Sequence, residues 1–450
     1  MVGYLLNVVY LAVVVAASPW LIYSAIRKGK YRQGFGEKML GRVPCRSGDA
    51  TCVWLHAVSV GEVKLLRPLV RQLAAERPDW ELVISTTTRT GRALAREVFP
   101  DHLTFYCPLD FTWAVRGALR RVRPDILVLA ELELWPNLIR LARRSGANVA
   151  VVNGRMSDNS FPGYRRIRPI IRRLLGHVQL IACQNEQYAD RFRQLGADDE
   201  TVSVTGSIKF DGIESDRENP ITRSLVELAE FSPGDVVFTA GSTHVGEEDA
   251  ALEAYVKLRR RHPELRLVLV PRHPERFSEV ARMLRGSGVS WQKRSELQAK
   301  DEGHVLHETG GDSPRVLLVD TIGELSAWWG ATDIAFVGGS LISHGGQNMI
   351  EPAALGAAIC FGESTHNFRD VVSSLLRADG AVVVEDATAL TKFIAKCLED
   401  RHYAQTLGRR AADVVAAGRG ATERTCDLVM ELGEVLAGSH GSKWSTRRAA

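Results

Sequence analysis

Apolar residues dominate the first 26 positions of the chain. The segment Met1–Ile26 contains no charged side chain, and as a helix it could cross the ~30 Å hydrocarbon core of a bilayer. Trp20 and Tyr23 near its end suit a membrane interface. Four basic residues follow at once: Arg27, Lys28, Lys30 and Arg32. Because basic flanks stay on the cytoplasmic side, we predict an N-terminal membrane anchor over residues 1–30 with the rest of the chain in the cytoplasm.

Two other interpretations of this segment stay open. A cleaved signal peptide would use small residues such as Ala16, Ala17 and Ser18, but no basic residue precedes the apolar run and the basic cluster lies on the wrong side. A buried core helix is the other alternative. Pro19 is expected to kink the helix or end it early. The length and the flanking charges favour a retained anchor.

After the anchor, short apolar runs alternate with amphipathic segments of helical period. In the first half these runs predict strands at Val53–Ala57, Glu81–Ser85, Asp125–Ala130, Asn148–Asn153, Gln179–Gln184 and Val202–Thr205. In the second half they predict strands at Val236–Ala240, Leu265–Val270, Arg315–Val319, Asp333–Val337, Ala358–Phe361 and Ala381–Val384. Helical patterns such as Glu62–Ala75 lie between them. Such alternation is typical of an α/β protein with parallel, doubly wound sheets.

The alternation pauses over a polar stretch from Asp211 to Pro220, which we interpret as a linker. It separates two predicted Rossmann-like domains, residues 31–215 and 216–436, and a flexible tail follows over 437–450. The polar segment Lys293–Pro314 is expected to be a loop insertion. Two such domains with a cleft between them would bind a ligand at the carboxyl ends of their strands.

Length and composition agree with two domains and exclude several classes of protein. The 450 residues are about three times the ~150 of one domain. The formal charge is 57 − 53 = +4, which gives no support to nucleic-acid binding. Seven scattered cysteines without a CxxC argue against a disulfide framework or zinc finger and fit a reducing compartment. The motifs of P-loop ATPases and dinucleotide-binding dehydrogenases are missing, and no Asp-x-Asp occurs, so no catalytic metal is predicted.

Charged residues follow three predicted strands of the first half. Glu62 comes after the first strand, where it is either a general base or an acid favoured by the start of a helix. Glu131 and Glu133 follow the strand ending at Ala130 and would share a face if extended; they are site carboxylates or helix-entry acids. Lys209 is either a surface lysine or a cation for developing negative charge.

Glycine-containing turns follow strands of the second half. They occur at Gly241–His244, Gly338–Ser340 and Ser343–Asn348. Backbone amides in such turns cradle anions, phosphate above all, so the three turns favour a nucleotide-phosphate site. Glu351 would bind ribose hydroxyls there or complete a helix cap. Arg272, after another strand, could reach a phosphate or a base.

Five arginines alternate with apolar residues over Tyr164–Leu175. The pattern fits a solvated helix face, and it also fits contact with an anionic membrane surface or a phosphorylated lipid. Given the predicted anchor, we favour the membrane.

Together these motifs closely resemble a known family. They occur in order as His56–Glu62, Glu131–Asn137, Gly206–Asp211, Val270–Phe277, Gly338–Ser340 and Gly345–Asn348. This order resembles the bacterial 3-deoxy-D-manno-octulosonic acid (Kdo) transferases of lipopolysaccharide synthesis. The resemblance extends from the anchor to about residue 430.

The resemblance implies a GT-B glycosyltransferase that moves Kdo, with inversion, from CMP-Kdo to lipid IVA on the cytoplasmic face of the inner membrane. By position, Glu62 corresponds to the catalytic base, and Glu131 and Lys209 to residues that support the transition state. The second domain would bind the donor, without cofactor or metal. The CMP contacts would fall on Pro271, Arg272, Ile322, Gly323, Glu324, Asn348, Met349, Ile350 and Glu351.

The sequence departs mildly from the family pattern at Gln347, where some relatives would carry His, and at the apolar pair Met349-Ile350. Two alternatives to the Kdo transferase remain. One is another GT-B enzyme that uses a UDP-sugar, such as a nucleotide-sugar epimerase or a lipid A disaccharide synthase. The other is a membrane-tethered nucleotide-binding scaffold without catalysis, against which the intact Glu62 argues.

Overall fold

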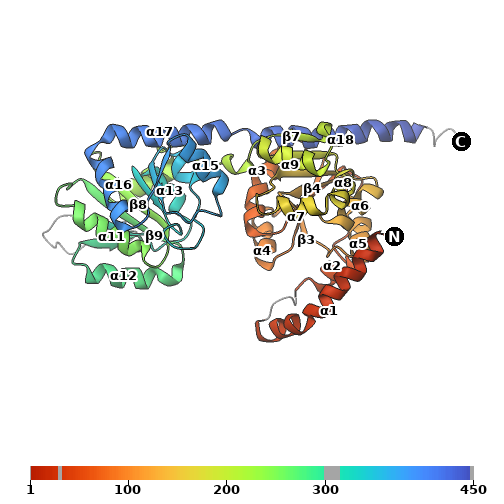
Figure 1. Cartoon of the computed structure of the whole chain (residues 1–450), viewed down its shortest axis with the longest axis horizontal. Coiled ribbons are helices and arrows are strands. Elements are labelled where there is room, and N and C mark those ends of the chain that lie inside the picture. Colours follow the sequence, from red (N-terminus) through yellow and green to blue (C-terminus); the bar gives the residue numbers. More distant parts are fainter. Residues whose placement is uncertain (1, 29–32, 298–314, 446–450) are drawn as a thin grey trace. The chain divides into compact units, whose positions relative to one another are not determined.

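The chain folds into two compact units, and each contains a parallel sheet. The computed structural model describes residues 2–28, 33–297 and 315–445 (Figure 1). One unit comprises Met1–Asp211 together with Gly418–Ala450, and the other comprises Gly212–Ala417. The change of unit after Asp211 falls inside the linker predicted from the sequence.

The first unit contains a seven-stranded sheet in the order β3-β2-β1-β4-β5-β6-β7, and every pairing is parallel. Its strands are β1 (Cys52–Ala57), β2 (Glu81–Thr86), β3 (Leu103–Tyr106), β4 (Ile126–Ala130), β5 (Asn148–Gly154), β6 (Leu180–Cys183) and β7 (Val202–Val204). The strand order reverses between β1 and β4, so a crevice for ligands is expected at their carboxyl ends.

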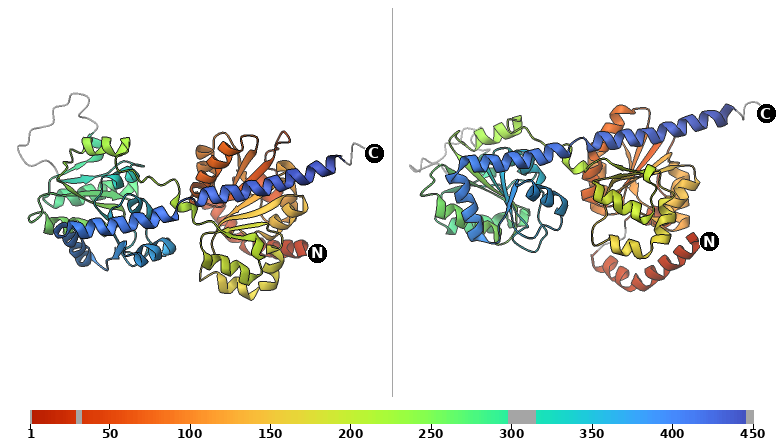
Figure 2. Two further views of the ribbon diagram at one scale, coloured as in Figure 1. Left: turned by 90° about the horizontal axis from the view of Figure 1, so that it is seen from above. Right: turned by 45° about the horizontal axis from the view of Figure 1, so that its top comes forward.

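Helices cover both faces of this sheet (Figure 2). The helices of this unit are α1 (Val2–Lys28), α2 (Phe35–Leu40), α3 (Val60–Glu76), α4 (Arg89–Val98), α5 (Thr112–Val122), α6 (Pro136–Arg144), α7 (Phe161–Arg166), α8 (Arg168–Leu175), α9 (Glu186–Leu195) and α18 (Ala421–Ser445). Short 3-10 turns occur at η1 (Asp199–Thr201) and η2 (Ile208–Phe210). Because helices lie on both sides, every residue of β1 and β4 is buried, and both strands consist almost entirely of apolar residues.

The second unit repeats this plan with the strand order β10-β11-β9-β8-β12-β13-β14, again all parallel. Its strands are β8 (Val236–Thr243), β9 (Leu265–Pro271), β10 (Trp291–Lys293), β11 (Val316–Leu318), β12 (Ile334–Val337), β13 (Ala358–Phe361) and β14 (Ala381–Val383). Its helices are α10 (Pro220–Leu228), α11 (Glu247–Leu258), η3 (Pro274–Arg276), α12 (Phe277–Gly286), α13 (Leu325–Gly330), α14 (Ile350–Ala354), α15 (Arg369–Arg377), α16 (Ala387–Glu399) and α17 (Arg401–Gly418). Here the strand order reverses between β8 and β12.

All twelve predicted strands occur, and no end differs from its predicted position by more than three residues. Sequence analysis missed β3 and β10, which are short strands at sheet edges with partly exposed residues. Their apolar runs are too short to stand out from the surrounding turns. The predicted loop insertion begins at the end of β10, and its residues 298–314 lie outside the described part of the chain.

The C-terminal helix packs in the first unit, not in the second domain where the sequence predicted it to residue 436. Cys426 and Val429 of α18 are fully buried in a core that also contains Leu66 and Leu69 of α3. The periodicity of α18 shows an apolar face but not which sheet that face covers. The predicted tail 437–450 also differs, because α18 continues to Ser445; residues 446–450 lie outside the described residues.

The N-terminal helix α1 contains the segment Gly3–Trp20, which is long and apolar enough to cross a membrane and is 11% buried. The helix continues through Pro19 to Lys28, so it does not end early. Of the predicted basic cluster, Lys30 and Arg32 lie outside the described residues.

Asp211, the last residue of the first unit before the chain enters the second, binds the start of α18. Its carboxylate accepts hydrogen bonds from the Gly420 amide at 2.8 Å, from the Thr422 amide, and from the Thr422 hydroxyl at 2.7 Å. The returning helix is therefore capped by a residue more than 200 positions earlier in the chain.

We predict that Asp211→Ala lowers the free energy of unfolding of the first unit by about 1–3 kcal/mol, because it removes hydrogen bonds to an ionised carboxylate. Guanidinium unfolding measures the effect. The exposed Asp427 of the same helix provides the matched control, since Asp427→Ala is expected to change stability by less than about 0.5 kcal/mol. Equal effects of the two substitutions would contradict the proposed cap.

Candidate active site

The reversal of strand order in the first unit brings two predicted site segments to one sheet edge. His56 of β1 pairs in register with Leu129 of β4, so both strands end at the same level. The turn after β1 leads into α3, whose first turn carries Glu62. Glu131 follows β4 directly. The sheet thus brings together two carboxylates that are 69 positions apart in the sequence.

Glu62 lies in a partly buried niche made by its own turn. One carboxylate oxygen accepts a hydrogen bond from the Val58 amide at 2.7 Å, and the other accepts one from the Ser59 hydroxyl at 3.2 Å. The pKa of Glu62 is raised to about 7, chiefly by burial; the nearby carboxylates of Glu133 and Glu131 contribute to the rise, and the Val58 and Ser59 hydrogen bonds oppose it. Glu62 therefore changes protonation near neutral pH.

Glu131 and Lys209 form an ion pair at the same edge. The distance from the Lys209 Nζ to the Glu131 Oε1 is 3.2 Å, and both side chains are partly buried. Glu131 has a φ of 52°, in the left-handed region that few non-glycine residues adopt. Such backbone strain is concentrated at functional sites, where the surrounding structure must hold it in place. The structure thus brings two of the predicted residues into direct contact.

Asn153 positions the segment that carries Lys209, and sequence analysis did not select it. Its side-chain oxygen accepts a hydrogen bond from the Ile208 amide at 3.1 Å, at the start of η2. Asn153 also has a left-handed φ, 53°, at the carboxyl end of β5 next to β4. The only sequence signal is an asparagine near the end of an apolar strand, since Asn is enriched in this conformation.

Glu133 does not share an extended segment with Glu131, because the left-handed Glu131 begins a turn. The Glu133 carboxylate accepts a hydrogen bond from the Trp135 indole at 2.7 Å. Burial raises the pKa of Glu133, which leaves it less readily ionised than an exposed glutamate. Glu133 acts on the site through its carboxylate, which contributes to the raised pKa of Glu62.

In the second unit, a buried glutamate occupies one of the predicted phosphate cradles. The Glu247 carboxylate accepts hydrogen bonds from the amides of His244, Gly339, Ser340 and Leu341 at 2.7–3.0 Å. The expectation that Gly338–Ser340 binds phosphate through its amides is therefore wrong for Gly339 and Ser340. The fold itself supplies the anion, from the first turn of α11.

Three histidines meet beside this glutamate. The His244 ring lies 4.2 Å from that of His344 and 5.4 Å from that of His273, between ring centroids. The pKa of His244 is lowered to about 4, chiefly by desolvation and also by the surrounding histidines and arginines, Arg272 among them. Sequence analysis did not select these histidines as a group, although each follows a strand that ends at the same edge. Arg272 itself is exposed, and its amide donates to the Thr243 carbonyl at 3.0 Å.

The predicted residues 348–351 lie at the start of α14 and are linked by side-chain hydrogen bonds. The Asn348 side chain accepts from the Ile350 amide at 3.1 Å and donates to Glu351 at 2.8 Å. Glu351 also accepts from the Ser326 hydroxyl at 2.9 Å. The Glu351 carboxylate therefore accepts from two side chains and from no backbone amide in these contacts, and both the capping role and ribose binding stay predictions. Met349 and Ile350 are buried, so only their backbone could reach a ligand.

The turn at Ile322–Glu324 is held by its own glutamate. The Arg294 guanidinium donates two hydrogen bonds of 2.9 Å to the Glu324 carboxylate, and the Thr321 hydroxyl donates a third at 2.7 Å. Gly323 takes a φ of 90°, and Ile322 is 79% exposed. Glu324 therefore fixes a turn whose exposed part is Ile322 and the Gly323 backbone. Pro271, the remaining predicted contact, is buried at the end of β9.

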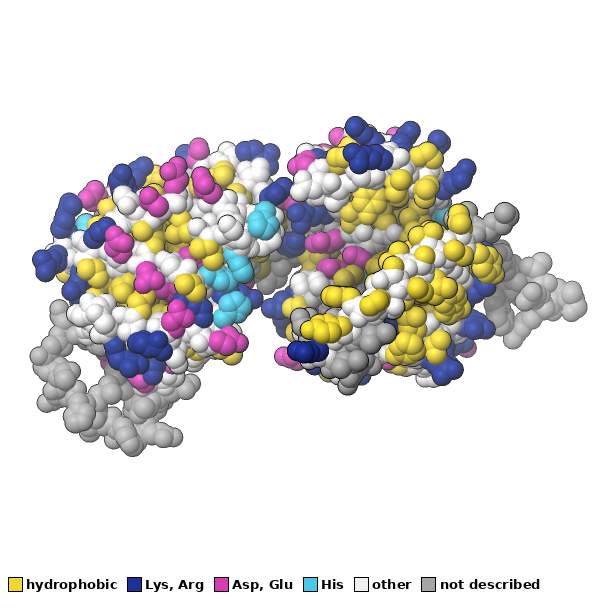
Figure 3. Space-filling model, turned by 60° about the horizontal axis from the view of Figure 1, so that its bottom comes forward, with side chains coloured by type: hydrophobic (Ala, Val, Ile, Leu, Met, Phe, Trp, Pro, Cys, Tyr) yellow, Lys and Arg dark blue, Asp and Glu magenta, His cyan; other side chains and the backbone are white. Residues whose placement is uncertain are grey.

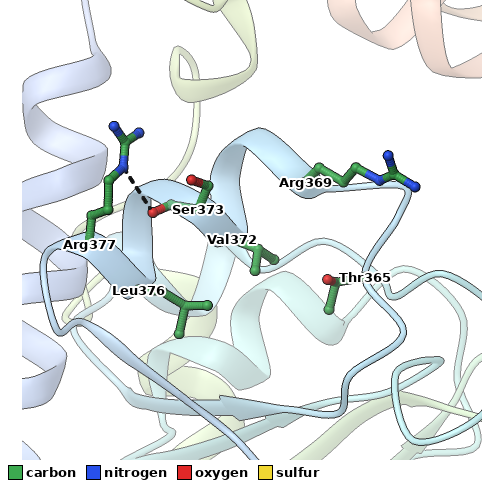
Figure 4. Close-up of a pocket in the computed structure, with 6 residues that line it drawn as sticks. All are labelled: Thr365, Arg369, Val372, Ser373, Leu376 and Arg377. Carbon is green, nitrogen blue, oxygen red and sulfur yellow. Dashed lines mark hydrogen bonds between the residues drawn. The ribbon is translucent and has the colours of Figure 1, made fainter. Parts of the chain in front are cut away.

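A shallow pocket elsewhere in this unit lies along α15 (Figure 4). Six side chains line it: Thr365, Arg369, Val372, Ser373, Leu376 and Arg377. The Arg377 guanidinium donates to the Ser373 carbonyl at 3.2 Å. This pocket contains none of the predicted donor residues.

Comparison with known proteins identifies the family. The family model described as 3-deoxy-D-manno-octulosonic-acid transferase (kdotransferase) matches residues 30–212. A 3-deoxy-D-manno-octulosonic acid transferase of Haemophilus influenzae is 32% identical over 410 residues, which cover 90% of this chain and 92% of the relative. The chain belongs to the Kdo transferase family. A transferase of the same name from Bordetella pertussis is 32% identical over 421 residues, 91% of this chain and 94% of its own.

The predicted enzyme class and fold are thereby confirmed. A UDP-GlcNAc 2-epimerase structure from Neisseria meningitidis covers 85% of this Kdo transferase and 100% of its own chain, with a TM-score of 0.57 and 11% identity. At that identity the likeness shows the fold alone. The two sheets of Rossmann-like order are therefore those of a GT-B glycosyltransferase.

The raised pKa of Glu62 predicts a pH-dependent stability. Because ionisation is harder in the folded protein, stability is greatest below the ordinary pKa of 4.5 and falls as the pH rises to about 7. Glu62→Gln removes this loss, so we expect its advantage in melting temperature over the native chain to grow between pH 5 and about 8. Glu97→Gln, at an exposed position of α4, is the control and should show no such trend. A constant difference for Glu62→Gln would contradict the raised pKa.

Proposed function

We propose that this enzyme transfers Kdo from CMP-Kdo to a hydroxyl of lipid IVA with inversion at the anomeric carbon. The observation that carries the proposal is a carboxyl group with a pKa of about 7 at the switch point of the first unit, in a member of the Kdo transferase family. An inverting transfer needs a base for the acceptor hydroxyl, and a base is most effective when its pKa lies near the working pH.

Glu62 is the proposed base. Its two hydrogen bonds, from the Val58 amide and the Ser59 hydroxyl, orient the carboxylate from its own turn. When deprotonated, it accepts the proton of the acceptor hydroxyl as the oxygen attacks the anomeric carbon. CMP leaves from the opposite face of that carbon, so the configuration inverts.

Lys209 is the proposed cation for the negative charge that develops during transfer. Its ammonium is held at 3.2 Å from Glu131, whose strained backbone is in turn fixed by the amide hydrogen bond to the Val152 carbonyl at 2.9 Å. We propose that Glu131 acts by orienting Lys209. In this arrangement neither Glu131 nor Lys209 takes part in the proton transfer, which is assigned to Glu62 alone.

The second unit is the proposed donor site. Arg272 is exposed at the end of β9, where it can bind a phosphate. The backbone of residues 348–351 and of the turn at 322–324 provides further groups that could bind the nucleotide. Because a CMP leaving group carries a monophosphate, a side chain such as Arg272 could neutralise it without a divalent ion. We therefore propose metal-independent catalysis.

The enzyme is proposed to act at the cytoplasmic face of the inner membrane. In support of this, α1 is apolar and largely exposed. The arginine-rich segment also fits, although it forms two short helices, α7 and α8, instead of one. Arg165, Arg166 and Arg168 are exposed there, as is Ile170. Such a surface suits contact with anionic lipid.

The direct test is transfer by the purified full-length protein. We predict that CMP-Kdo and lipid IVA give a lipid product heavier by one or more Kdo units, detected by mass spectrometry, with an unchanged rate after EDTA removes divalent ions before the transfer step. A UDP-sugar in place of CMP-Kdo is the control and should give no product. Tight binding of UDP but not CMP would instead favour the UDP-sugar alternative.

Glu62→Gln is predicted to lower kcat by about 10²- to 10⁴-fold while CMP binding to the second unit is retained, because only the proton acceptor is lost. In the native enzyme, kcat should rise with pH along a limb whose apparent pKa lies near 7. Glu97→Gln should leave both measurements unchanged. Full activity of Glu62→Gln would exclude Glu62 as the base.

A further inference from the structure

The N-terminal part of the apolar helix α1 and the next helix, α2, are attached to the same end of α5. Near the N-terminus, the Asn7 side chain donates a hydrogen bond to the Thr112 hydroxyl at 2.7 Å and accepts one from the Thr112 amide at 3.0 Å. After α1, the Met39 carbonyl accepts a hydrogen bond from the Trp113 indole at 2.9 Å. Thr112 and Trp113 are consecutive residues in the first turn of α5.

The N-terminal attachment is closely fitted. Asn7 is buried, with 7% of its surface exposed. One turn later, the Tyr10 hydroxyl donates to the Asp110 carboxylate at 3.0 Å. Gly3 lies beside the Arg140 guanidinium of α6, which a Cβ at Gly3 would displace. These contacts make residues 3–10 part of the first unit.

The helix that follows α1, α2, is also attached to the first unit. The Lys38 carbonyl accepts from the Leu109 amide at 2.8 Å, and the Glu37 carboxylate accepts from the Tyr106 amide at 2.6 Å. Gly41 has a left-handed φ of 63°, and a Cβ there would come within 1.9 Å of the Ala114 carbonyl. The chain therefore leaves α5 near Asn7 and returns to it near Met39.

This arrangement is incompatible with a helix that crosses the bilayer. The 27 residues of α1 extend about 40 Å at 1.5 Å per residue. If they crossed a ~30 Å hydrocarbon core, Asn7 and Met39 would lie on opposite sides of it. Asn7 would then lose both buried hydrogen bonds, and an unpaired amide is costly in lipid.

The exposed surface of α1 has the composition expected of a surface that contacts lipid. Nine large apolar side chains there are each 50–67% exposed: Tyr4, Leu5, Val8, Val9, Leu11, Val13, Val15, Trp20 and Tyr23. They form the yellow band on α1 in Figure 3. No charged residue interrupts them before Arg27, whose guanidinium lies over the Tyr23 ring at 5.8 Å. Aromatic and basic residues at one end of an apolar helix suit the lipid headgroup region.

We propose that α1 is inserted in the cytoplasmic leaflet without crossing the membrane, so that both its ends lie on the cytoplasmic side. This inference rests on the proposed membrane site of action and refines it. The buried Asn7 amide is the contact that retains the N-terminal end, and the exposed apolar face is the part that enters the lipid.

The test compares two thiols in inner membranes. Cys45 is exposed in the first unit and reports the cytoplasmic side; the other six native cysteines are buried. A second thiol is added in a short tag before Met1. Intact spheroplasts and inverted membrane vesicles are treated with a membrane-impermeant maleimide, and labelled peptides are identified by mass spectrometry.

We expect both thiols to be labelled in inverted vesicles and neither in spheroplasts. Labelling of the tag in spheroplasts while Cys45 stays protected would show a crossing helix and overturn the proposal. Recovery of the protein in the soluble fraction, as a dimer or with another protein covering α1, would also overturn it. Kdo transfer is measured on the same samples. If transfer occurs while α1 crosses the membrane or the protein is soluble, the proposed position of α1 is wrong and the proposed reaction still holds.

Asn7→Leu tests the retaining contact itself. Without the amide, the N-terminal end is free to insert, so we expect the labelled fraction of the tag in spheroplasts to rise several-fold. Ala12→Leu, at an exposed position of the same helix, adds similar apolar volume without touching α5 and should leave the tag protected. The same labelling pattern in both variants would overturn the role of Asn7.

Discussion

The geometry of both candidate sites depends on one constraint: parallel strands whose order reverses at the centre of the sheet. The reversal leaves the carboxyl ends of β1 and β4 adjacent in one unit, and those of β8 and β12 adjacent in the other. In each unit the first strand leads into a helix with a glutamate in its first turn, Glu62 in α3 and Glu247 in α11. The two glutamates thus hold comparable positions in the two Rossmann-like sheets, but their surroundings differ. Four backbone amides saturate the buried Glu247 carboxylate, so it serves as a fixed internal anion. Glu62 receives one amide and one hydroxyl in a partly buried niche, which leaves its pKa near 7 and its proton exchangeable.

The sequence predicted the sheets and the site segments, because both depend on local pattern. Buried parallel strands are continuous apolar runs, and the residues that follow them lie at the ligand edge by topology alone. The features that the sequence could not predict depend on contacts between segments far apart in the chain. The periodicity of α18 does not specify the core in which Cys426 and Val429 are buried. Likewise, Gly338–Ser340 has the composition of a phosphate cradle, and only the fold brings Glu247 into it. The left-handed conformation of Glu131 and Asn153 is also imposed by tertiary structure, since neither residue type requires it.

The attachment of α1 and the candidate active site share a structural element. The Asp110 carboxylate accepts the Tyr10 hydroxyl, and it also accepts the amides of Asn137 and Leu138 at 2.9 and 2.8 Å. Those amides begin α6, which follows directly after the turn carrying Glu131 and Glu133. One carboxylate therefore contacts both α1 and the helix that follows the turn of the candidate site. A crossing anchor joined by a flexible segment would leave the orientation of the first unit toward lipid undetermined. In the proposed arrangement, a helix that lies in the leaflet and is held to the first unit by Asn7 and Tyr10 would constrain that orientation, which would be an advantage if a lipid presents the acceptor hydroxyl.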